Sequence, residues 1–424
     1  MTAINNNKDT LINELMPFVI IGIPIFIFIY HVYVYAVNLP RYDDYDAILG
    51  FLNSYKNATI EEKFRLLFTQ HNEHRIFSSR LSYVFFKGFF GTINFRYIIL
   101  FNALLLVSIY LLLVHLVRKV LPNLWQVGAL ALSISIFDLT NYENANFAMA
   151  GMQNFGIILL FLYSMYFYSI SSNKFLIIAV LLQILCVFSS GNGVIGSFLV
   201  TAYVLLTGSK TKRVVAIFTF ILVTPLYYIS FNKGASDFFT LNPAKFIPYF
   251  LHSLGSHFGF KSGLIAAVLM LFLFVFLLPV NRKGSLKRLS GSSVHAMIFL
   301  FLGLFILSSL GVMSIFRGNT EVEISCSSRY TIYSHLFAGV VFILFLLKYK
   351  DTNKLLDISS VSIIILITVY TLNYEEGRTG FVTFYTSKRD IQYQYPDLQR
   401  AKVISDEACR LNIYCIEQAR TKLR

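Results

Sequence analysis

The sequence predicts an all-α protein, a polytopic transmembrane helical bundle of about eleven spans (ten to twelve). Charged residues make up only 14% of the 424 residues, whereas a soluble domain carries roughly 25%. Apolar residues make up 56% and gather in long runs, such as 18–37 and 97–117. Runs of this length cross about 30 Å of hydrocarbon as helices, which satisfy their own backbone in lipid. The alternating pattern of a transmembrane barrel is absent.

The arrangement of basic residues predicts how these spans are oriented. We place the spans at 17–37, 96–117, 121–137, 148–169, 175–190, 193–208, 214–231, 263–281, 295–316, 334–349 and 358–373. Basic clusters at 118–119, 210–213, 282–288 and 348–354 are separated by four, two and two predicted spans. These even numbers place all four clusters on the cytoplasmic side. The N-terminus is then cytoplasmic and the C-terminus periplasmic, in a bacterial inner (cytoplasmic) membrane. The net charge of +14 follows from the same clusters, so we expect no nucleic-acid partner.

Two regions follow from this layout, a transmembrane domain at 1–373 and an external C-terminal tail or small cap at 374–424. The first external loop, 38–95, has apolar residues at helical spacing in 47–55 and 60–68 and an aromatic-rich stretch at 77–90. These segments resemble amphipathic juxtamembrane helices. The spans at 175–208 meet at a turn-forming string, 189–193, which is either a surface hairpin turn or a broken span that lines a cavity.

Within the span interiors, Asp, Glu, Lys and Arg are essentially absent, which argues against ion-coupled transport. Polar chemistry is therefore expected in the external segments. The first loop opens with Asp43, Asp44 and Asp46, which could supply a general base or bind a divalent cation. The alternative is a solvated acidic start to a loop.

The second polar group is the strip 70–75. If the strip is helical, His71, His74 and Arg75 share one face, and the carboxylate of Glu73 lies within about one helical turn of them. Arginine and histidine donors favour a phosphate or sugar over a metal, although Asp43, Asp44, His71 and His74 remain candidate metal ligands. A solvated helix face is the simpler alternative.

The third polar group lies in the short external loops. Amide and carboxylate side chains open the fourth span and suit contacts with sugar hydroxyls, or ordinary helix capping, namely Asn141, Glu143, Gln153 and Asn154. Arg317 and Arg329, the latter followed by Tyr330, flank the loop between the ninth and tenth spans. Both arginines could grip a lipid-linked phosphate, and snorkelling is the alternative for Arg317.

Together these features are similar to the GT-C superfamily of glycosyltransferases, in which a first span is followed by an external acidic motif and a long loop with juxtamembrane helices. The strip 70–75 and the later Ser328-Arg329-Tyr330 also look like a group of bacterial polytopic membrane proteins often found with surface-polysaccharide genes. The resemblance implies inverting transfer of a sugar from a polyprenyl-phosphate donor to a glycan or lipid-linked acceptor on the periplasmic face. It also implies that Asp43 or Asp44 is the base and that Arg75, Arg317 and Arg329 bind the leaving phosphate. The chain lacks the large soluble C-terminal domain of better-known members.

Two other functions remain open. An O-antigen or polysaccharide polymerase would use a diphosphate-linked oligosaccharide and depend on external arginines, whereas the acidic pair favours single-sugar transfer. A lipid-linked sugar flippase should carry cations inside its spans, where the sequence has none. The sequence also predicts a disulfide between Cys409 and Cys415 in the tail, because an oxidising periplasm permits one.

Overall fold

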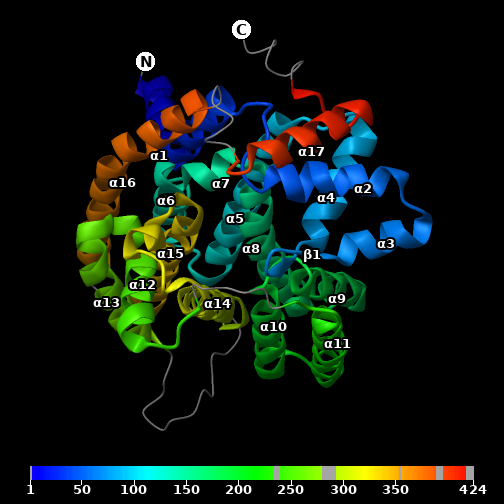
Figure 1. Cartoon of the computed structure of the whole chain (residues 1–424). Helices are drawn as coiled ribbons and strands as arrows, with labels where there is room; N and C mark the ends of the chain where they lie inside the picture. The colour runs from blue at the N-terminus through cyan, green and yellow to red at the C-terminus, as the bar shows by residue number, and fades with distance from the viewer. Residues whose placement is uncertain (1, 233–238, 279–292, 353–354, 388–394, 417–424) are drawn as a thin grey trace.

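The computed structural model describes residues 2–232, 239–278, 293–352, 355–387 and 395–416, and these residues are almost entirely helical (Figure 1). The predicted all-α class is confirmed. Within the described part of the chain, the one sheet is a short antiparallel hairpin of β1 (Gln70–His71) and β2 (His74–Arg75).

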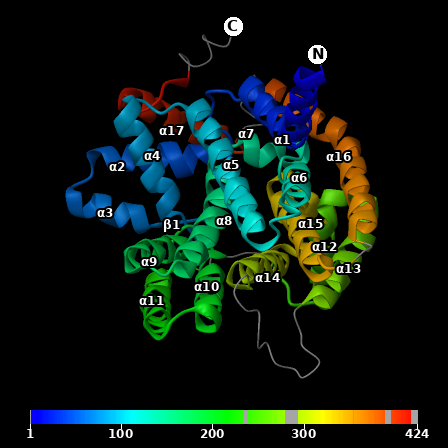
Figure 2. The same cartoon turned by 180° about the vertical axis from the view of Figure 1, so that it is seen from behind.

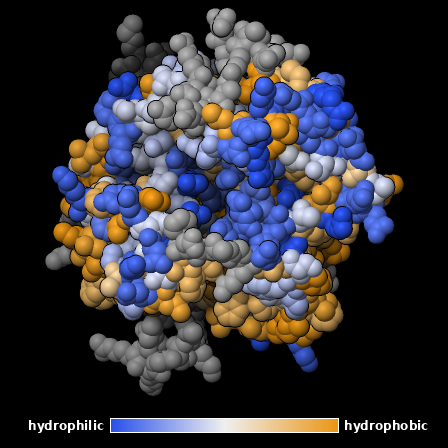
Figure 3. All heavy atoms as spheres, viewed as in Figure 1, coloured by the Kyte–Doolittle hydropathy of each residue, from blue (hydrophilic) through white to orange (hydrophobic). Residues whose placement is uncertain are grey.

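Seven helices among the described residues are long and apolar enough to cross a membrane, which indicates a multi-pass membrane protein. They are α1 (Thr2–Tyr35, apolar from Leu15), α5 (Phe95–Val120), α8 (Ala148–Ser169), α11 (Lys210–Tyr228), α13 (Phe260–Leu277), α14 (Ser293–Arg317) and α15 (Ser328–Tyr349). Large apolar side chains on their outer faces are exposed, for example Phe26, Phe218 and Phe272, as expected of a wall that faces lipid. Hydrophobic residues accordingly dominate the lower part of the molecule in Figure 3, whereas hydrophilic residues gather across its centre and upper right.

The predicted count of eleven spans stays a prediction. Each predicted span falls on a helix, but α6 (Trp125–Ile136), α9 (Asn173–Val187) and α10 (Gly193–Thr207) are shorter than the ~20 residues that a span needs. The last predicted span, 358–373, lies in a longer helix, α16 (Leu355–Thr386). This helix extends past the predicted end of the span and includes Glu375 and Arg378, which form an ion pair at 2.8 Å. The basic cluster at 282–288 lies outside the described residues.

The remaining elements are short and connect the long helices. They are a π-helix, η1 (Tyr45–Gly50), the α-helices α2 (Phe51–Asn57), α3 (Ile60–Phe68), α4 (Phe77–Phe90), α7 (Tyr142–Asn146), α12 (Pro243–Gly255) and α17 (Leu398–Arg410), and the 3-10 turns η2 (Leu139–Asn141), η3 (Ser256–Phe258) and η4 (Val322–Cys326).

The first loop contains the helices that its periodicity predicts. Helices α3 and α4 have the predicted bounds, and a capping box between Thr59 and Glu62 begins α3. The interpretation of 70–75 as a helix is wrong, because this strip forms the hairpin β1–β2, in which Asn72 adopts a left-handed conformation with φ of 48°. Asn tolerates this conformation and favours such turns. His71 therefore faces His74 across the hairpin.

The turn between α9 and α10 lies inside the protein. Ser189 and Ser190 are buried, and the Oγ atoms of Ser189 and Ser78 lie 2.6 Å apart. The backbone N–H of Phe77 donates to the Phe188 carbonyl at 2.8 Å. Of the two alternatives for this string, a turn at the surface does not fit this packing, and a broken span that lines a cavity stays a prediction.

The C-terminal segment packs on the first loop. Helix α17 contacts η1 and α2, and Arg400 pairs with Asp46 at 2.6 Å. The hydroxyl of Tyr414 donates to the Asn38 carbonyl at 2.8 Å. A disulfide joins Cys409 and Cys415, which confirms the predicted pairing. Figures 1 and 2 show α17 beside α2 and α4, on the opposite side of the molecule from α13 and α16.

This packing leads to a prediction about orientation, because the C-terminal segment and the first loop must share one side of the membrane. Alkaline phosphatase fused after residue 424 should be active, since that enzyme folds only in the oxidising periplasm. The same reporter fused after Gly208, beside the basic cluster at 210–213, should be inactive and serves as the control. The predicted topology would be contradicted if alkaline phosphatase fused after residue 424 were inactive while green fluorescent protein fused at the same position were fluorescent.

Candidate functional site

The two adjacent carboxylates at the start of the first loop have different surroundings. Asp44 is buried, and its carboxyl oxygens accept from the backbone N–H groups of Arg41 at 3.0 Å and Met149 at 2.9 Å. It thereby closes the turn after α1 and holds the first turn of α8. Burial raises the pKa of Asp44 to about 8, outweighing these two backbone N–H groups. A carboxyl that is protonated near neutral pH and enclosed by backbone is a poor general base.

Asp43 is the accessible member of the pair. Its side chain is 40% exposed, and one carboxylate oxygen lies 4.0 Å from Nε2 of His71. Burial lowers the pKa of His71 below its ordinary value, although the charge of Asp43 opposes this shift. The pair therefore places a carboxylate beside an imidazole whose neutral form is favoured, an arrangement that can accept a proton.

The hairpin places His74 next to the buried turn between α9 and α10. A side chain at Gly191 would lie 2.7 Å from Nδ1 of His74, so only glycine allows this contact. Burial lowers the pKa of His74, and its Nδ1 has no hydrogen-bond partner among the described residues. The charges of Glu73, Arg317 and His71 all act on His74, so these groups lie near one another.

Arg75, which the resemblance predicts to bind phosphate, instead donates its hydrogen bonds to backbone carbonyls. It is buried, and its Nε donates to the Tyr227 carbonyl at 2.7 Å. Its two terminal nitrogens donate to the carbonyls of Phe68 and Ile229. The guanidinium thus satisfies carbonyls at the ends of α3 and α11, where helices leave acceptors unpaired. The structure does not bring Arg75 into the site as a free donor.

Arg317 and Arg329 meet around one aromatic ring. Their guanidinium carbons lie 5.8 Å and 5.5 Å from the ring centroid of Tyr330, within cation–π range. Arg317 is the last residue of α14 and Arg329 the second residue of α15, so the loop between these helices brings the two cations together. The negative charges of Asp43 and Glu143 both act on Arg329.

Glu143 and the neighbouring amide side chains surround the start of α15 at Arg329. Glu143 accepts from the Ser327 hydroxyl and the Arg329 backbone N–H, both at 2.9 Å, and lies 4.0 Å from Nε of Arg329. A carboxylate at this position caps α15. Asn154 donates to Asn144 at 2.7 Å and to the Arg329 carbonyl at 3.2 Å. Capping and anchoring the start of α15 is therefore a substantial part of the role of Glu143 and Asn154.

The other two predicted amide side chains, Gln153 and Asn141, differ in how many of their polar atoms have hydrogen-bond partners. Gln153 donates to the Ser190 hydroxyl at 3.0 Å, which links α8 to the buried turn. Asn141 accepts from Asn144 at 2.8 Å, but its own amide nitrogen is buried without a hydrogen-bond partner among the described residues. That amide is a donor left for a ligand or a water.

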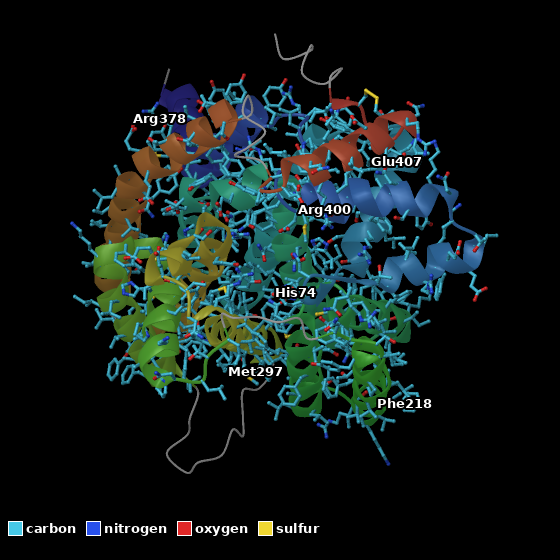
Figure 4. All side chains as sticks on the ribbon, in the orientation of Figure 1. His74, Phe218, Met297, Arg378, Arg400 and Glu407 are labelled. Atoms are coloured by element: carbon cyan, nitrogen blue, oxygen red, sulfur yellow. A yellow bond between two sulfur atoms is a disulfide. The ribbon has the colours of Figure 1, made fainter. Side chains whose placement is uncertain are left out.

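Taken together, the structure brings most predicted residues to one place. The group, which we call the loop site, consists of Asp43, His71, His74, Glu143, Arg317, Arg329 and Tyr330. Figure 4 shows His74 near the centre of the molecule, below Arg400 and far from Arg378. A polar pocket of about 400 Å³ borders His71 and is also lined by Asp46, Arg80 and Arg400.

Sequence reasoning missed several residues of this region. Tyr42, with φ of 41°, places its ring 5.7 Å from that of Phe147. Asn192 donates to the hydroxyls of Ser309 and Tyr333 at 3.1 Å and 3.0 Å. The glycine-flanked turn was the available signal for Asn192, since such turns inside a membrane protein line protein contacts.

Of the four candidate metal ligands, the structure brings Asp43 and His71 together at 4.0 Å, whereas Asp44 is occupied by backbone N–H groups. A cation at this position stays a prediction.

The fold and the loop site define a multi-pass helical membrane protein with a charged site where its first loop, a buried turn and the α14–α15 connection meet. The chain matches no protein-family model and no curated protein sequence. Its function is therefore inferred from the chemistry of these residues.

Proposed function

We propose that the protein is a membrane glycosyltransferase that moves a sugar from a polyprenyl-phosphate donor to a hydroxyl of a glycan or lipid-linked acceptor on the periplasmic face. The observation that carries this proposal is the electrostatic effect of one accessible carboxylate, Asp43, on Arg329, which shares the Tyr330 ring with a second cation, Arg317. Sugar transfer from a phosphate needs both, a base for the acceptor and positive charge for the leaving group.

In the proposed reaction, Asp43 accepts the proton of the acceptor hydroxyl while that oxygen forms a bond to the anomeric carbon. The bond from this carbon to the phosphate oxygen breaks, and its electron pair leaves with polyprenyl phosphate. Attack opposite the leaving group inverts the anomeric centre. Arg317 and Arg329 stabilise the negative charge that grows on the phosphate, and neutral His71 keeps the Asp43 carboxylate in place.

The surroundings of the site suit a lipid donor. Arg317 and Arg329 stand at the ends of two helices that are long and apolar enough to span a membrane, a position from which an arginine side chain can reach lipid phosphates. An apolar groove of about 550 Å³ between α4 and α5 is lined by Phe85, Phe89 and Phe101, among others. Helix α4 begins at the buried turn and leads to this groove, which suits an isoprenoid tail. The polar pocket beside His71 suits an acceptor glycan.

The proposal is tested with purified full-length protein in liposomes. Three labelled donors are compared: a polyprenyl-phosphate monosaccharide, a polyprenyl-diphosphate oligosaccharide and a nucleotide sugar, each with a surface-glycan extract as acceptor. We expect transfer from the first donor and release of polyprenyl phosphate. Transfer of whole oligosaccharides from the second donor would instead establish the polymerase, which shares the need for arginines. Movement of the first donor across the bilayer without transfer would establish the flippase.

A further inference from the structure

A second cluster of chemistry-bearing side chains lies apart from the loop site, between α6, η3 and α15. Asp138 follows α6, His257 belongs to η3 and His335 lies in α15. All three side chains are fully buried, and each offers one potential ligand atom within 4.8 Å of the others. The distance from Nδ1 of His257 to Oδ2 of Asp138 is 3.7 Å, and the two imidazole rings are 4.7 Å apart.

The hydrogen bonds of this cluster are incomplete. Both ring nitrogens of His257 and Nδ1 of His335 are buried and have no hydrogen-bond partner among the described residues. A buried polar atom without a hydrogen-bond partner destabilises the folded state. One of the two nitrogens of a neutral imidazole carries a lone pair, which a metal ion can accept. A core histidine that served only packing would be expected to find partners for these nitrogens.

A second layer of hydrogen bonds holds the three side chains in position. The backbone N–H and hydroxyl of Thr140 donate to Asp138 at 2.9 Å and 2.6 Å, and this hydroxyl lies 3.2 Å from Nε2 of His335. Asn373 of α16 donates both to Asp138 and to the His257 carbonyl at 2.9 Å. Such outer partners are characteristic of metal ligands, whose orientation they determine.

We propose that Asp138, His257 and His335 form a structural site for a divalent transition-metal ion of the Zn²⁺ class. Two imidazoles and one carboxylate are a ligand set that Zn²⁺ takes, whereas Mg²⁺ and Ca²⁺ prefer oxygen. Binding would draw the ligand atoms from within 4.8 Å of one another to roughly 3.3 Å, the separation set by tetrahedral bonds of about 2.0–2.1 Å. Small rotations of three side chains suffice for this movement.

The ion would join segments that are distant in sequence, at a place that matters for the loop site. The Ser328 hydroxyl donates to the Thr140 carbonyl, and the Glu143 backbone N–H donates to the Ser328 hydroxyl at 2.9 Å. A metal at Asp138 and His335 thus anchors both the segment that carries Glu143 and the helix that carries Arg329. This inference concerns the assembly of the fold and does not depend on the reaction proposed for the loop site.

The test uses full-length protein in detergent, from which bound metal is first removed with a chelator. The protein is then reloaded with Zn²⁺ alone, and its metal content is measured by elemental mass spectrometry. We expect about one Zn²⁺ per chain, with water as the fourth ligand, and a lower unfolding temperature after chelation. Reloading with Co²⁺ should give the visible absorption of a four- or five-coordinate ion. Wild-type protein that takes up neither ion above a buffer control would overturn the proposal.

Variants locate the ion. His257→Gln and His335→Gln should remove it, whereas His252→Gln, which removes an imidazole outside the cluster, should keep it. Because the first two could fail to fold, Thr140→Val supplies a milder change, since it removes only the bridging hydroxyl. Its Zn²⁺ affinity should fall roughly 10–100-fold, as for other outer partners. Equal metal content and affinity in Thr140→Val and wild type, or loss of the ion in His252→Gln, would contradict the assignment.

Discussion

Asp43→Asn is expected to lower sugar transfer by roughly 10²–10⁴-fold while protein level and thermal stability stay close to wild type, since a general base contributes about that much. Asp43 is 40% exposed, so an amide of the same shape disturbs no packing. The asparagine cannot accept the proton of the acceptor hydroxyl. The measurement is the rate of label transfer from a polyprenyl-phosphate sugar per folded molecule in liposomes.

The neighbouring carboxylate provides the contrast. Asp44→Asn should destabilise the protein by about 1–3 kcal/mol, because the new amide group faces a backbone N–H that had an acceptor. Activity per folded molecule should change much less than in Asp43→Asn. Glu61→Gln, an exposed carboxylate on α3 in the same loop, is the matched control and should behave as wild type. Full activity of Asp43→Asn, with loss confined to Asp44→Asn, would reverse the assignment of the base.

Removing either arginine of the pair at Tyr330 is expected to slow transfer by roughly 10²–10³-fold, the loss seen when one donor to a developing negative charge is deleted. Arg317→Gln and Arg329→Gln keep hydrogen-bonding capacity but lose the charge. If both cations contact one phosphate, the double variant should lose less than the product of the two single losses. Rates with a polyprenyl-phosphate donor measure these effects.

Arg378→Gln is the control for this pair, because Arg378 is exposed on α16 and lies far from the loop site in Figure 4. It should leave the rate unchanged. Arg317→Lys and Arg329→Lys should recover part of the rate, since lysine restores charge without the two-pronged geometry of arginine. If the rate is normal in both glutamine variants, the phosphate must bind elsewhere, and the proposed role of the loop site fails.

Much of the helical fold could be predicted from local sequence. The bounds of α3 and α4 follow from apolar periodicity together with the capping residues Thr59 and Glu62, and each predicted span coincides with a helix. The disulfide of Cys409 and Cys415 was also predictable, since the two cysteines are only six residues apart. The strip 70–75 was not, because its residues suit a helix face while Asn72 and Glu73 allow a tight turn.

The candidate site was only half predictable. The sequence identified the polar segments that meet there, because the interiors of the predicted spans hold essentially no charge. It could not separate Asp43 from Asp44 or Arg75 from Arg329, since identical side chains differ only in what surrounds them. Arg75 meets carbonyls of α3 and α11, whereas Arg329 faces Tyr330 and Glu143. The cluster of Asp138, His257 and His335 gave no local signal, as its members come from three distant segments.

Hydropathy and periodicity are properties of neighbouring residues, so they are enough to predict a helical multi-pass membrane protein. Three features depend on tertiary packing: which carboxylate is accessible, which arginines are not taken up by backbone carbonyls, and where two buried histidines meet. A charged side chain takes its role from the groups that fold against it, since burial and partners determine whether it is ionised, paired or available.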